Sequence, residues 1–308
     1  MKALTLAQYS EKYLDPANVP ADTRTAEIET ADCALPRRAR VSHKYSCGRA
    51  LIVAGASGYA GAPVLAANAC ERSGAGLTQL MVPESIYPVA AMRCDGAVVQ
   101  PLPAAEDGGF AACAAAALAR TLEKASAAAI GPGLGAGEQA KALVKSTVQN
   151  AACPLVLDAD ALRVLADDPR LPERYNAPLI LTPHEGEFRR LGGDLTAGRL
   201  AGALRFTAEH PRVILILKGY GTLVCRGAEA AVNPTGGPAM AKGGSGDVLT
   251  GILCGLLAQG FEPWFAARSA VYLHGLAGDL AAAELGEYSL APSDLIRYLP
   301  QAIRTVLP

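Results

Sequence analysis

The chain has 308 residues, of which 51% are hydrophobic and 19% charged, and its formal net charge is -1. This composition excludes a disordered chain, and the balanced charge indicates no binding of nucleic acid or of an anionic membrane. Any phosphate group that the protein binds must therefore be held by local features of the chain.

The N-terminus lacks the pattern of a secreted protein. Its first residues, MKALTLAQYSEKYLDP, carry charges where a signal peptide has an apolar run. No uncharged apolar stretch reaches the ~18 residues that span a bilayer. The eight cysteines are scattered without a C-x-x-C pair, which is typical of buried thiols in a reducing compartment. We expect a globular, cytoplasmic protein.

Residues 1–46 are more polar than the rest of the chain. They predict a short helix after Thr5, then a loop punctuated by prolines, PANVPADTRT, and then the stretch ALPRRARVSHK. We expect this N-terminal accessory segment to pack on a single main domain formed by residues 47–308.

From Gly48 onward, apolar runs alternate with alanine- and leucine-rich stretches of helical length. The runs are RALIVAG, LTQLMV, AAAIGPG, PLVLDAD, PLILTPH, VILILKG and TLVCRG. This alternation predicts an α/β fold with a mostly parallel sheet and helices on both faces. Open α/β sheets bind ligands beyond the carboxyl ends of their strands. The candidates for one such rim are Gly55, Gly131, Asp158, His184 and Lys218.

The stretch GASGYAGAP, residues 55–63, follows a predicted strand and precedes a predicted helix. Its G-x-x-G-x-x-G spacing is compatible with a nicotinamide dehydrogenase, with Glu84 as the ribose ligand. Against this alternative, no tyrosine is followed four residues later by a lysine. Close packing of a tight turn would also explain the glycines.

Acidic residues and a histidine follow two further strands. In LVLDADAL, Asp158 and Asp160 could hold Mg²⁺ or a phosphate-bound water, or could cap the next helix. In LTPHEGEF, we interpret His184 as a ligand contact and Glu187 as an indirect holder of Mg²⁺ or of a phosphate-bound water. The four histidines lack paired metal-ligand spacing, which argues against structural zinc.

A lysine and two glycines follow the apolar run VILIL. Lysine charge, flexible backbone and a hydroxyl within five residues suit nucleotide phosphates, although a plain hairpin turn is an equal alternative. A P-loop is absent from the sequence. The candidate nucleotide-binding residues here are Lys218, Gly219, Tyr220, Gly221 and Thr222.

The stretch MAKGGSGDVLTGILCGLLAQG, residues 240–260, runs from glycines into an apolar and therefore buried helix. Its start offers free N–H groups and a partial positive charge to a phosphate, through Gly243, Gly244, Ser245 and Gly246. Asp247 could simply cap the helix. A carboxylate repels phosphate, however, so Asp247 is better suited to orient or deprotonate a hydroxyl that attacks phosphorus. The stretch therefore indicates phosphoryl transfer.

The motifs together, in this order, resemble a known family. They are SHKYSCGRALIVAGASGYAGAPVLAANACERSGAG, IGPGLG, VLDADAL, LTPHEGEFRRL, LKGYGTLV and NPTGGPAMAKGGSGDVLTG. From about Ser42 to the C-terminus the chain is similar to the NAD(P)H-hydrate dehydratases of the ribokinase-like superfamily. Related sugar and vitamin kinases generally have Asn at the position of His184. Gly237 and Ala239 depart from the family, which often has Asn and Gly there.

The resemblance implies a ribokinase-like fold, a homotetramer and repair of hydrated NADH or NADPH at the expense of ADP in bacteria or ATP in eukaryotes. It implies that the hydrated dinucleotide contacts Ala62, Gly133, His184 and Asp247. It implies that residues 218–222 and Gly246 hold the adenine nucleotide. Many bacterial relatives carry an additional epimerase domain. Because residues 1–46 are too short for one, we expect any epimerase to be a separate partner.

The chemistry of this substrate predicts a mechanism. Asp247 activates the hydroxyl of the hydrate, and the GGSG amides and Mg²⁺ stabilise the transferred phosphoryl group. Phosphate then leaves, and loss of a neighbouring proton restores the dihydropyridine. The sequence does not indicate which group removes that proton. The alternatives are a small-molecule kinase of the same fold, which would keep its phosphorylated product, and a nucleotide sensor without activity.

Overall fold

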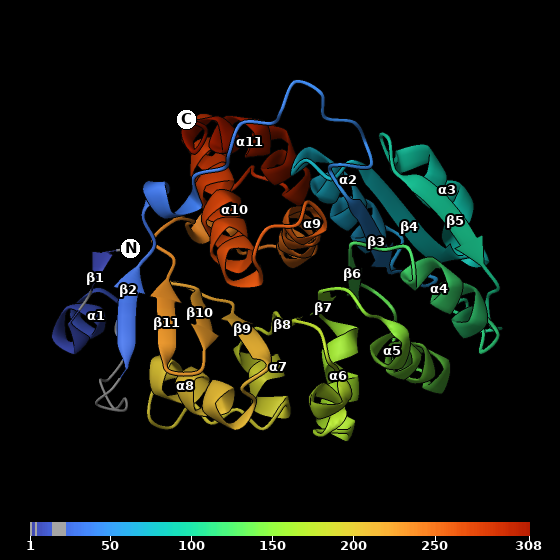
Figure 1. Ribbon diagram of the computed structural model, residues 1–308, viewed down its shortest axis with the longest axis horizontal. Coiled ribbons are helices and arrows are strands. Elements are labelled where there is room, and N and C mark those ends of the chain that lie inside the picture. Colours follow the sequence, from blue (N-terminus) through green and yellow to red (C-terminus); the bar gives the residue numbers. More distant parts are fainter. Residues whose placement is uncertain (1, 4, 14–22) are drawn as a thin grey trace.

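The computed structural model describes residues 2–3, 5–13 and 23–308. Its strands form one sheet of eleven strands in the order β1-β2-β11-β10-β9-β8-β7-β6-β3-β4-β5 (Figure 1). The strands are β1 (Lys2–Ala3), β2 (Arg24–Glu27), β3 (Arg49–Val53), β4 (Leu77–Pro83), β5 (Val98–Leu102), β6 (Ala127–Ile130), β7 (Leu155–Leu157), β8 (Leu179–Leu181), β9 (Val213–Leu217), β10 (Leu223–Arg226) and β11 (Glu229–Val232).

Helices connect these strands. The α-helices are α1 (Leu6–Tyr13), α2 (Gly61–Arg72), α3 (Tyr87–Arg93), α4 (Ala114–Leu122), α5 (Glu138–Asn150), α6 (Asp160–Asp167), α7 (Glu185–Arg190), α8 (Arg199–Glu209), α9 (Ser245–Ala258), α10 (Pro263–Leu285) and α11 (Pro292–Thr305). The short 3₁₀ helices are η1 (Thr30–Cys33), η2 (Glu84–Ile86), η3 (Leu171–Arg174) and η4 (Pro238–Met240). Each apolar run that the sequence analysis interpreted as a strand coincides with one of the strands, to within one residue for β4.

The sheet is mostly parallel, as predicted. The strands from β5 through β4, β3, β6, β7 and β8 to β9 pair in parallel. Only the pairs β9–β10, β10–β11 and β1–β2 within the described residues are antiparallel. Because neighbouring strands of the parallel block point the same way, their carboxyl ends meet at one edge.

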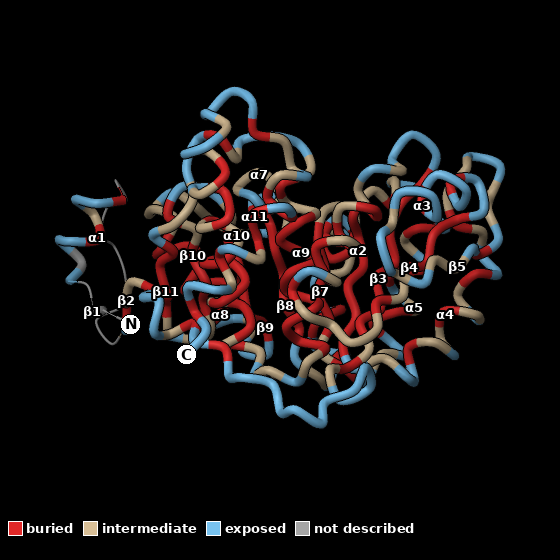
Figure 2. Tube along the Cα trace, turned by 90° about the horizontal axis from the view of Figure 1, so that it is seen from above, coloured by how far each residue is buried: buried red, intermediate tan, exposed pale blue. Residues whose placement is uncertain are grey.

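Side chains of each strand alternate between two cores. In β3, Ala50 and Ile52 join the core under α2, α9, α10 and α11, whereas Leu51 and Val53 join the core under α4, α5, α6 and α8. Figure 1 shows these two helical layers on opposite faces of the sheet. Figure 2 shows the buried residues concentrated between the layers. The predicted arrangement of helices on both faces is confirmed.

The N-terminal segment contributes to the sheet itself. Helix α1 forms after Thr5 as predicted, and β2 pairs in parallel with β11, with Ala26 opposite Ala231. The backbone N–H of Leu35 donates to the carbonyl of Val306 at 3.0 Å, which ties the segment to the C-terminal helix. The predicted proline-containing loop lies largely outside the described residues. Strand β2 thus extends the sheet beyond β11, and the rest of the segment crosses the helical layer, where Arg38 donates to Gln259 at 2.7 Å.

Helix α9 lies at the centre of its layer, and nearly all of its side chains are buried. It packs closely on α2 because glycines face that helix. A Cβ atom at Gly251 would lie 2.1 Å from the carbonyl oxygen of Ala66, and one at Gly255 would lie 2.0 Å from the Ser73 hydroxyl. This close contact fixes where the N-terminus of α9 meets the sheet edge. No helix in the described part of the chain is apolar over a length that would cross a bilayer.

Candidate functional site

The predicted rim residues do meet at the carboxyl edge of the parallel block. Gly55 follows β3, Gly131 follows β6, and Asp158 follows β7. His184 follows β8, and its backbone forms a parallel bridge with Lys218, which follows β9. The N-terminus of α9 adds Asp247 to the same edge, because a Cβ atom on the neighbouring Gly246 would lie 3.4 Å from Lys218 Nζ and Thr250 of the same helix donates to Asp158.

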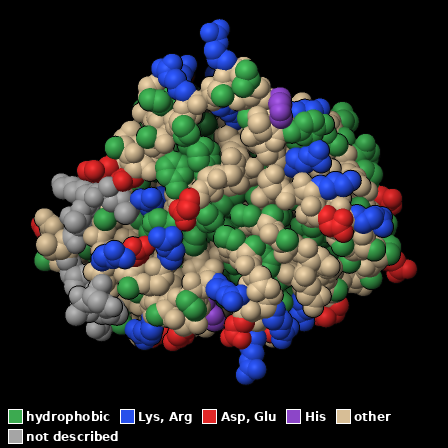
Figure 3. Space-filling view, viewed as in Figure 1, with side chains coloured by type: hydrophobic (Ala, Val, Ile, Leu, Met, Phe, Trp, Pro, Cys, Tyr) green, Lys and Arg blue, Asp and Glu red, His purple; other side chains and the backbone are tan. Residues whose placement is uncertain are grey.

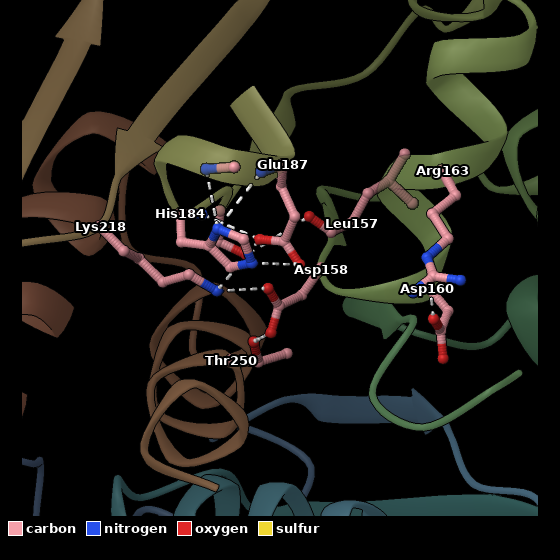
Figure 4. Close-up of polar contacts among 10 residues, drawn as sticks. Leu157, Asp158, Asp160, Arg163, His184, Glu187, Lys218 and Thr250 are labelled. Atoms are coloured by element: carbon pink, nitrogen blue, oxygen red, sulfur yellow. Dashed lines mark hydrogen bonds and ion pairs between the residues drawn. The ribbon is translucent and has the colours of Figure 1, made fainter. Parts of the chain in front are cut away.

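Asp158 lies at the bottom of the site, where its side chain is 1% exposed. Lys218 Nζ donates to its Oδ1 at 2.9 Å, and the hydroxyl of Thr250 on α9 donates to its Oδ2 at 2.6 Å (Figure 4). Burial pushes the pKa of Asp158 up, but the Lys218 ammonium and these hydrogen bonds bring it below its usual value. Asp158 is therefore an ionised, fully bonded carboxylate. It does not cap α6, where no side-chain capping bond forms.

Lys218 connects this acidic residue to the glycine-rich turn. Its ammonium is 3.9 Å from Glu187 Oε2, and a Cβ atom at Gly246 would lie 3.4 Å from it. Burial lowers the pKa of Lys218, but Asp158 and Glu187 raise it above its usual value overall. The sequence analysis assigned Lys218 to nucleotide phosphates and did not foresee its ion pair with Asp158. The two residues are 60 positions apart, and only the sheet brings them together.

Asp247 is the third residue of α9, and Gly244 occupies the N-cap position with φ +101° and no side-chain capping bond. The alternative that Asp247 only caps this helix therefore has no capping hydrogen bond to support it. Burial, and next the negative charge of Asp158, raise the pKa of Asp247 to about 7, although Lys218 opposes the shift. A carboxylate with this pKa exchanges a proton near neutral pH, as a general base requires.

His184 caps α7 with its side chain. Its Nδ1 accepts the backbone N–H groups of Gly186 at 3.0 Å and Glu187 at 3.2 Å, and Glu187 accepts the backbone N–H of His184 at 2.8 Å. Because Nδ1 is an acceptor here, the neutral ring carries its proton on Nε2. The side chain is 56% exposed. His184 Nε2 lies 3.5 Å from Glu187 Oε1, so its N–H is beside that carboxylate on an exposed side of the ring.

The second glycine-rich turn packs against the loop after β6. The N–H of Gly55 donates to the carbonyl of Pro132 at 2.9 Å. Gly133 has φ +63°, and a Cβ atom there would lie 2.8 Å from Tyr59 Cβ and 3.4 Å from Ala62 Cβ. The structure thus brings Gly133 and Ala62 into contact. Close packing accounts for Gly55, where a Cβ atom would lie 2.5 Å from Ile86 Cδ1, but not for Gly58 and Gly61, where a Cβ atom would have no neighbour within 4 Å.

A cavity of about 450 Å³ opens beside Lys218. It contains all five residues of the 218–222 loop, together with Ser245 and Gly246 from the start of α9. Gly243 and Gly244 come just before these two residues in the chain and do not line the cavity. The loop is also the hairpin connection between β9 and β10, so the alternative of a hairpin turn is confirmed, and its contact with nucleotide phosphates stays a prediction. The lining is completed by Asn233, Thr235, Gly236, Gly237, Pro238, Met240, Ala241, Leu249, Val271, His274 and Gly275.

His274 is one of the lining residues that the sequence analysis did not assign to the site. Its Nε2 is buried without a hydrogen-bond partner in the described part of the protein. Burial lowers the pKa of His274 to about 4, so the ring is neutral. It lies within an apolar helix, α10, where the sequence alone favours an ordinary core position.

The surroundings of the site do not form a ready-made metal centre. Across residues 2–3, 5–13 and 23–308, no three His, Cys, Asp or Glu side chains cluster as a metal-ligand set. Lys and Arg side chains alternate with Asp and Glu around the face drawn in Figure 3, and hydrophobic side chains gather nearer its middle.

Comparison with known proteins gives one family. The family model for NAD(P)H-hydrate dehydratase matches residues 50–301. The bifunctional NAD(P)H-hydrate repair enzyme Nnr of Moorella thermoacetica is 40% identical over 276 residues, which cover 88% of this chain and 52% of that enzyme. The enzyme of the same name from Gloeobacter violaceus is 42% identical over 267 residues, covering 85% and 51%. This chain spans about half the length of these relatives.

Solved structures agree with this family. An ADP/ATP-dependent NAD(P)H-hydrate dehydratase from Bacillus subtilis, co-crystallised with ATP/Mg²⁺, is 31% identical with a TM-score of 0.76, covering 94% of this chain and 99% of that one. A ribokinase-like superfamily protein from Enterococcus faecalis is 27% identical with a TM-score of 0.79, covering 92% and 96%. The dehydrogenase alternative finds no support among these relatives. The chain belongs to the NAD(P)H-hydrate dehydratase family and has its ribokinase-like fold.

Proposed function

We propose that the protein is an ADP-dependent (S)-NAD(P)H-hydrate dehydratase, which returns hydrated NADH or NADPH to the reduced cofactor and releases phosphate and AMP. The observation that carries the proposal is the position of Asp247. It is the third residue of α9, directly after Ser245 and Gly246 of the lining of the 450 Å³ cavity, and its pKa is raised to about 7. Family membership supplies the substrate class.

In this proposal the nucleotide occupies the cavity and the hydrated ring lies at Ala62, Gly133 and His184. Asp247 takes the proton of the ring hydroxyl, whose oxygen forms a bond to the β-phosphorus of ADP as the bond to AMP breaks. The N–H groups at the start of α9 and the Lys218 ammonium stabilise the transferred phosphoryl group. His184 Nε2–H donates to the substrate and orients it.

Dehydration then follows from the chemistry of the ester. The C–O bond breaks and phosphate leaves with the electron pair. The lone pair of the ring nitrogen forms a double bond to the carbon that carried the phosphate. Loss of a proton from the adjacent carbon restores the dihydropyridine. Phosphorylation is needed because hydroxide is a poor leaving group near neutral pH. No net oxidation or reduction occurs in these steps.

The family resemblance implies Mg²⁺ as a cofactor. The carboxylates at this edge could hold it in one arrangement. Mg²⁺ keeps several waters and takes one or two carboxylates besides substrate phosphates. Asp158 is already bonded through both oxygens, which leaves Glu187 and Asp247 on this edge. When bound, Mg²⁺ would neutralise charge on the transferred phosphoryl group. Glu187 would hold it through water, since its Oε2 already accepts the His184 N–H.

ADP should support the reaction better than ATP, because the relatives named above come from bacteria and the resemblance assigns ADP to bacterial members. The test incubates the purified protein with hydrated NADH, Mg²⁺ and either nucleotide at matched concentration. Recovery of the dihydropyridine absorbance should be faster with ADP. Equal or faster recovery with ATP would reverse the nucleotide assignment, and no recovery with either would reject the activity.

The rate should depend on pH through Asp247. Because a general base must be ionised, kcat/KM should rise as pH increases through about 7, the pKa of Asp247, and level off above it. Below that value the rate should fall about tenfold for each pH unit. A pH profile from 5.5 to 9 with hydrated NADPH measures this (roughly the range over which a single such group titrates). A flat profile below pH 7 would show that no base with this pKa acts in the reaction.

Three further proposals concern the setting of the enzyme. We infer a cytoplasmic location, supported by its free cysteines and by a substrate derived from NADH and NADPH. We infer a homotetramer, supported by the family resemblance, and light scattering showing a monomer would exclude it. An epimerase acting on the same substrate is an expected partner, since the relatives are named as bifunctional repair enzymes.

A further inference from the structure

The function proposed above gives no role to the N-terminal helix α1. The family model matches residues 50–301, so α1 lies outside the matched region. Figure 1 shows α1 beside β2, at the end of the sheet that also contains β11 and β10. Its residues Tyr9 and Tyr13 are buried, at 1% and 6% exposure, in the same core as side chains of β9 and β10. Helix α1 is therefore packed into the main domain.

Tyr13, the last residue of α1, contacts the loop that lines the nucleotide cavity. A Cβ atom at Gly221 would lie 2.3 Å from Tyr13 Cδ1, and the ring centroids of Tyr13 and Tyr220 are 5.9 Å apart. Gly221 has φ +57°, and both Tyr220 and Gly221 line the 450 Å³ cavity. Only glycine fits this position, because the Tyr13 ring occupies the space of a side chain. The ring thus supports the loop directly.

The Tyr13 ring is itself held in place by the sheet. Its hydroxyl donates to Glu27 Oε2 at 2.8 Å, and Lys12 forms an ion pair with the same carboxylate. Burial, and next the hydrogen bond and charge of Glu27, raise the pKa of Tyr13 well above its usual value, so the hydroxyl keeps its proton and remains a donor. Glu27 belongs to β2, which pairs with β11. The position of the ring is therefore set by the fold.

Arg199, at the start of α8, gives the loop a second support. Its Nη1 donates to the carbonyl of Tyr220 at 2.5 Å, and its Nη2 donates to the carbonyl of Leu217 at 3.3 Å. A Cβ atom at Gly219 would lie 2.8 Å from the same Nη2. Arg199 thus fixes backbone carbonyls at both ends of the turn, whereas Tyr13 packs on its glycine and on the Tyr220 ring.

We propose that α1 is part of the nucleotide site, and that Tyr13 is a positioning residue that holds residues 219–221 in the conformation that binds ADP. The inference rests on the proposed function for the identity of the nucleotide. Glycines leave a backbone many alternative conformations, and ordering such a segment on binding costs free energy. A ring that orders the loop before ADP arrives removes part of this cost. Loss of the ring should therefore weaken ADP binding without changing the chemical step.

The kinetic test uses Tyr13→Leu, which keeps apolar volume in the core and removes the ring. KM for ADP should rise about 10-fold, because the nucleotide must then order the loop itself. At saturating ADP, kcat and KM for hydrated NADPH should stay within about twofold. Tyr13→Phe keeps the ring and should raise KM for ADP less than about threefold. An unchanged KM for ADP in Tyr13→Leu, or a fall in kcat as large as the rise in KM, would overturn the proposal.

Glu11→Gln is the matched control, because Glu11 lies on the same helix and its side chain is exposed. This surface substitution should leave KM for ADP within about twofold of the unmodified protein. An equal rise of KM in Glu11→Gln and Tyr13→Leu would show a general loosening of α1 and would overturn the role of Tyr13.

Hydrogen exchange tests the same coupling without turnover. Coupling between two sites is reciprocal, so a helix that favours ADP binding must be stabilised by ADP. Saturating ADP should slow exchange of the α1 amides about 10-fold more than that of α4, which lies at the other end of the sheet (Figure 1). The difference should disappear in Tyr13→Leu.

The outcomes of this measurement separate the inference from the proposed activity. Bound ADP that leaves exchange in α1 unchanged would overturn the role of Tyr13, even if the protein dehydrates its substrate. Slower exchange that depends on Tyr13 would support the role, even if hydrated NADH and NADPH prove not to be substrates.

Discussion

Asp247→Asn is expected to lower turnover of hydrated NADPH by about 10² to 10⁴-fold, the usual effect of losing a general base. Asparagine keeps the size of the side chain but cannot take the hydroxyl proton. The measurement is kcat under saturating ADP and Mg²⁺. Nucleotide affinity should be retained or improved, since a negative charge beside the phosphates is removed.

The same variant should be more stable than the unmodified protein at neutral pH. Folding raises the pKa of Asp247, so the free energy of unfolding falls as pH rises from about 4 to 7 and the buried group ionises. Removing this ionisable group should raise the free energy of unfolding by about 1–3 kcal/mol at pH 8, measured by urea unfolding. Near-normal turnover in a folded Asp247→Asn protein would contradict the assigned role. It would leave Asp247 as a structural residue.

Lys218→Met should destabilise the protein by about 3–5 kcal/mol, because it leaves Asp158 charged and buried without its partner. Methionine fills much of the same volume, so the loss reports charge and not packing. Urea unfolding measures it. Nucleotide binding should also weaken, by about 1–3 kcal/mol, through loss of a charge-assisted phosphate contact.

A second substitution distinguishes the ion pair from a general effect. Asp158→Asn in the Lys218→Met background removes the unpaired charge and should restore most of the lost stability. Lys145→Met, on the exposed face of α5, is the control and should change stability by less than about 0.5 kcal/mol. If the double variant is no more stable than Lys218→Met, the buried charge is not the cause of the loss.

The central strands could be predicted because each is a short apolar run between polar turns. The edge strands could not. Strand β5 has the sequence VVQPL, whose proline and polar residue argue against a strand, and β2 is the polar stretch RTAE. Both form because a neighbouring strand offers them hydrogen-bond partners, which is a property of the folded sheet. The sequence did not predict that β2 of the N-terminal segment joins the sheet, because its pairing with β11 depends on the folded sheet.

The residues at the rim of the site could be predicted, but the hydrogen bonds and ion pairs among them could not. The rule that ligands bind beyond strand ends correctly grouped Asp158, His184 and Lys218. The Asp158–Lys218 ion pair joins the ends of β7 and β9, and no local sequence pattern predicts it. The capping role of His184 could have been found, since a polar residue followed three positions later by Glu187 is a capping pattern. The raised pKa of Asp247 depends on burial by distant elements and has no sequence signal.

The products formed from hydrated NADPH and ADP test the account most directly, because they separate a dehydratase from a kinase on the same fold. Phosphorus NMR and chromatography follow one reaction mixture with Mg²⁺ over time. The account predicts that phosphate, AMP and NADPH appear in equal amounts, with no phosphorylated dinucleotide accumulating. A stable phosphoester of the hydrate, formed without free phosphate or NADPH, would contradict it and identify a kinase.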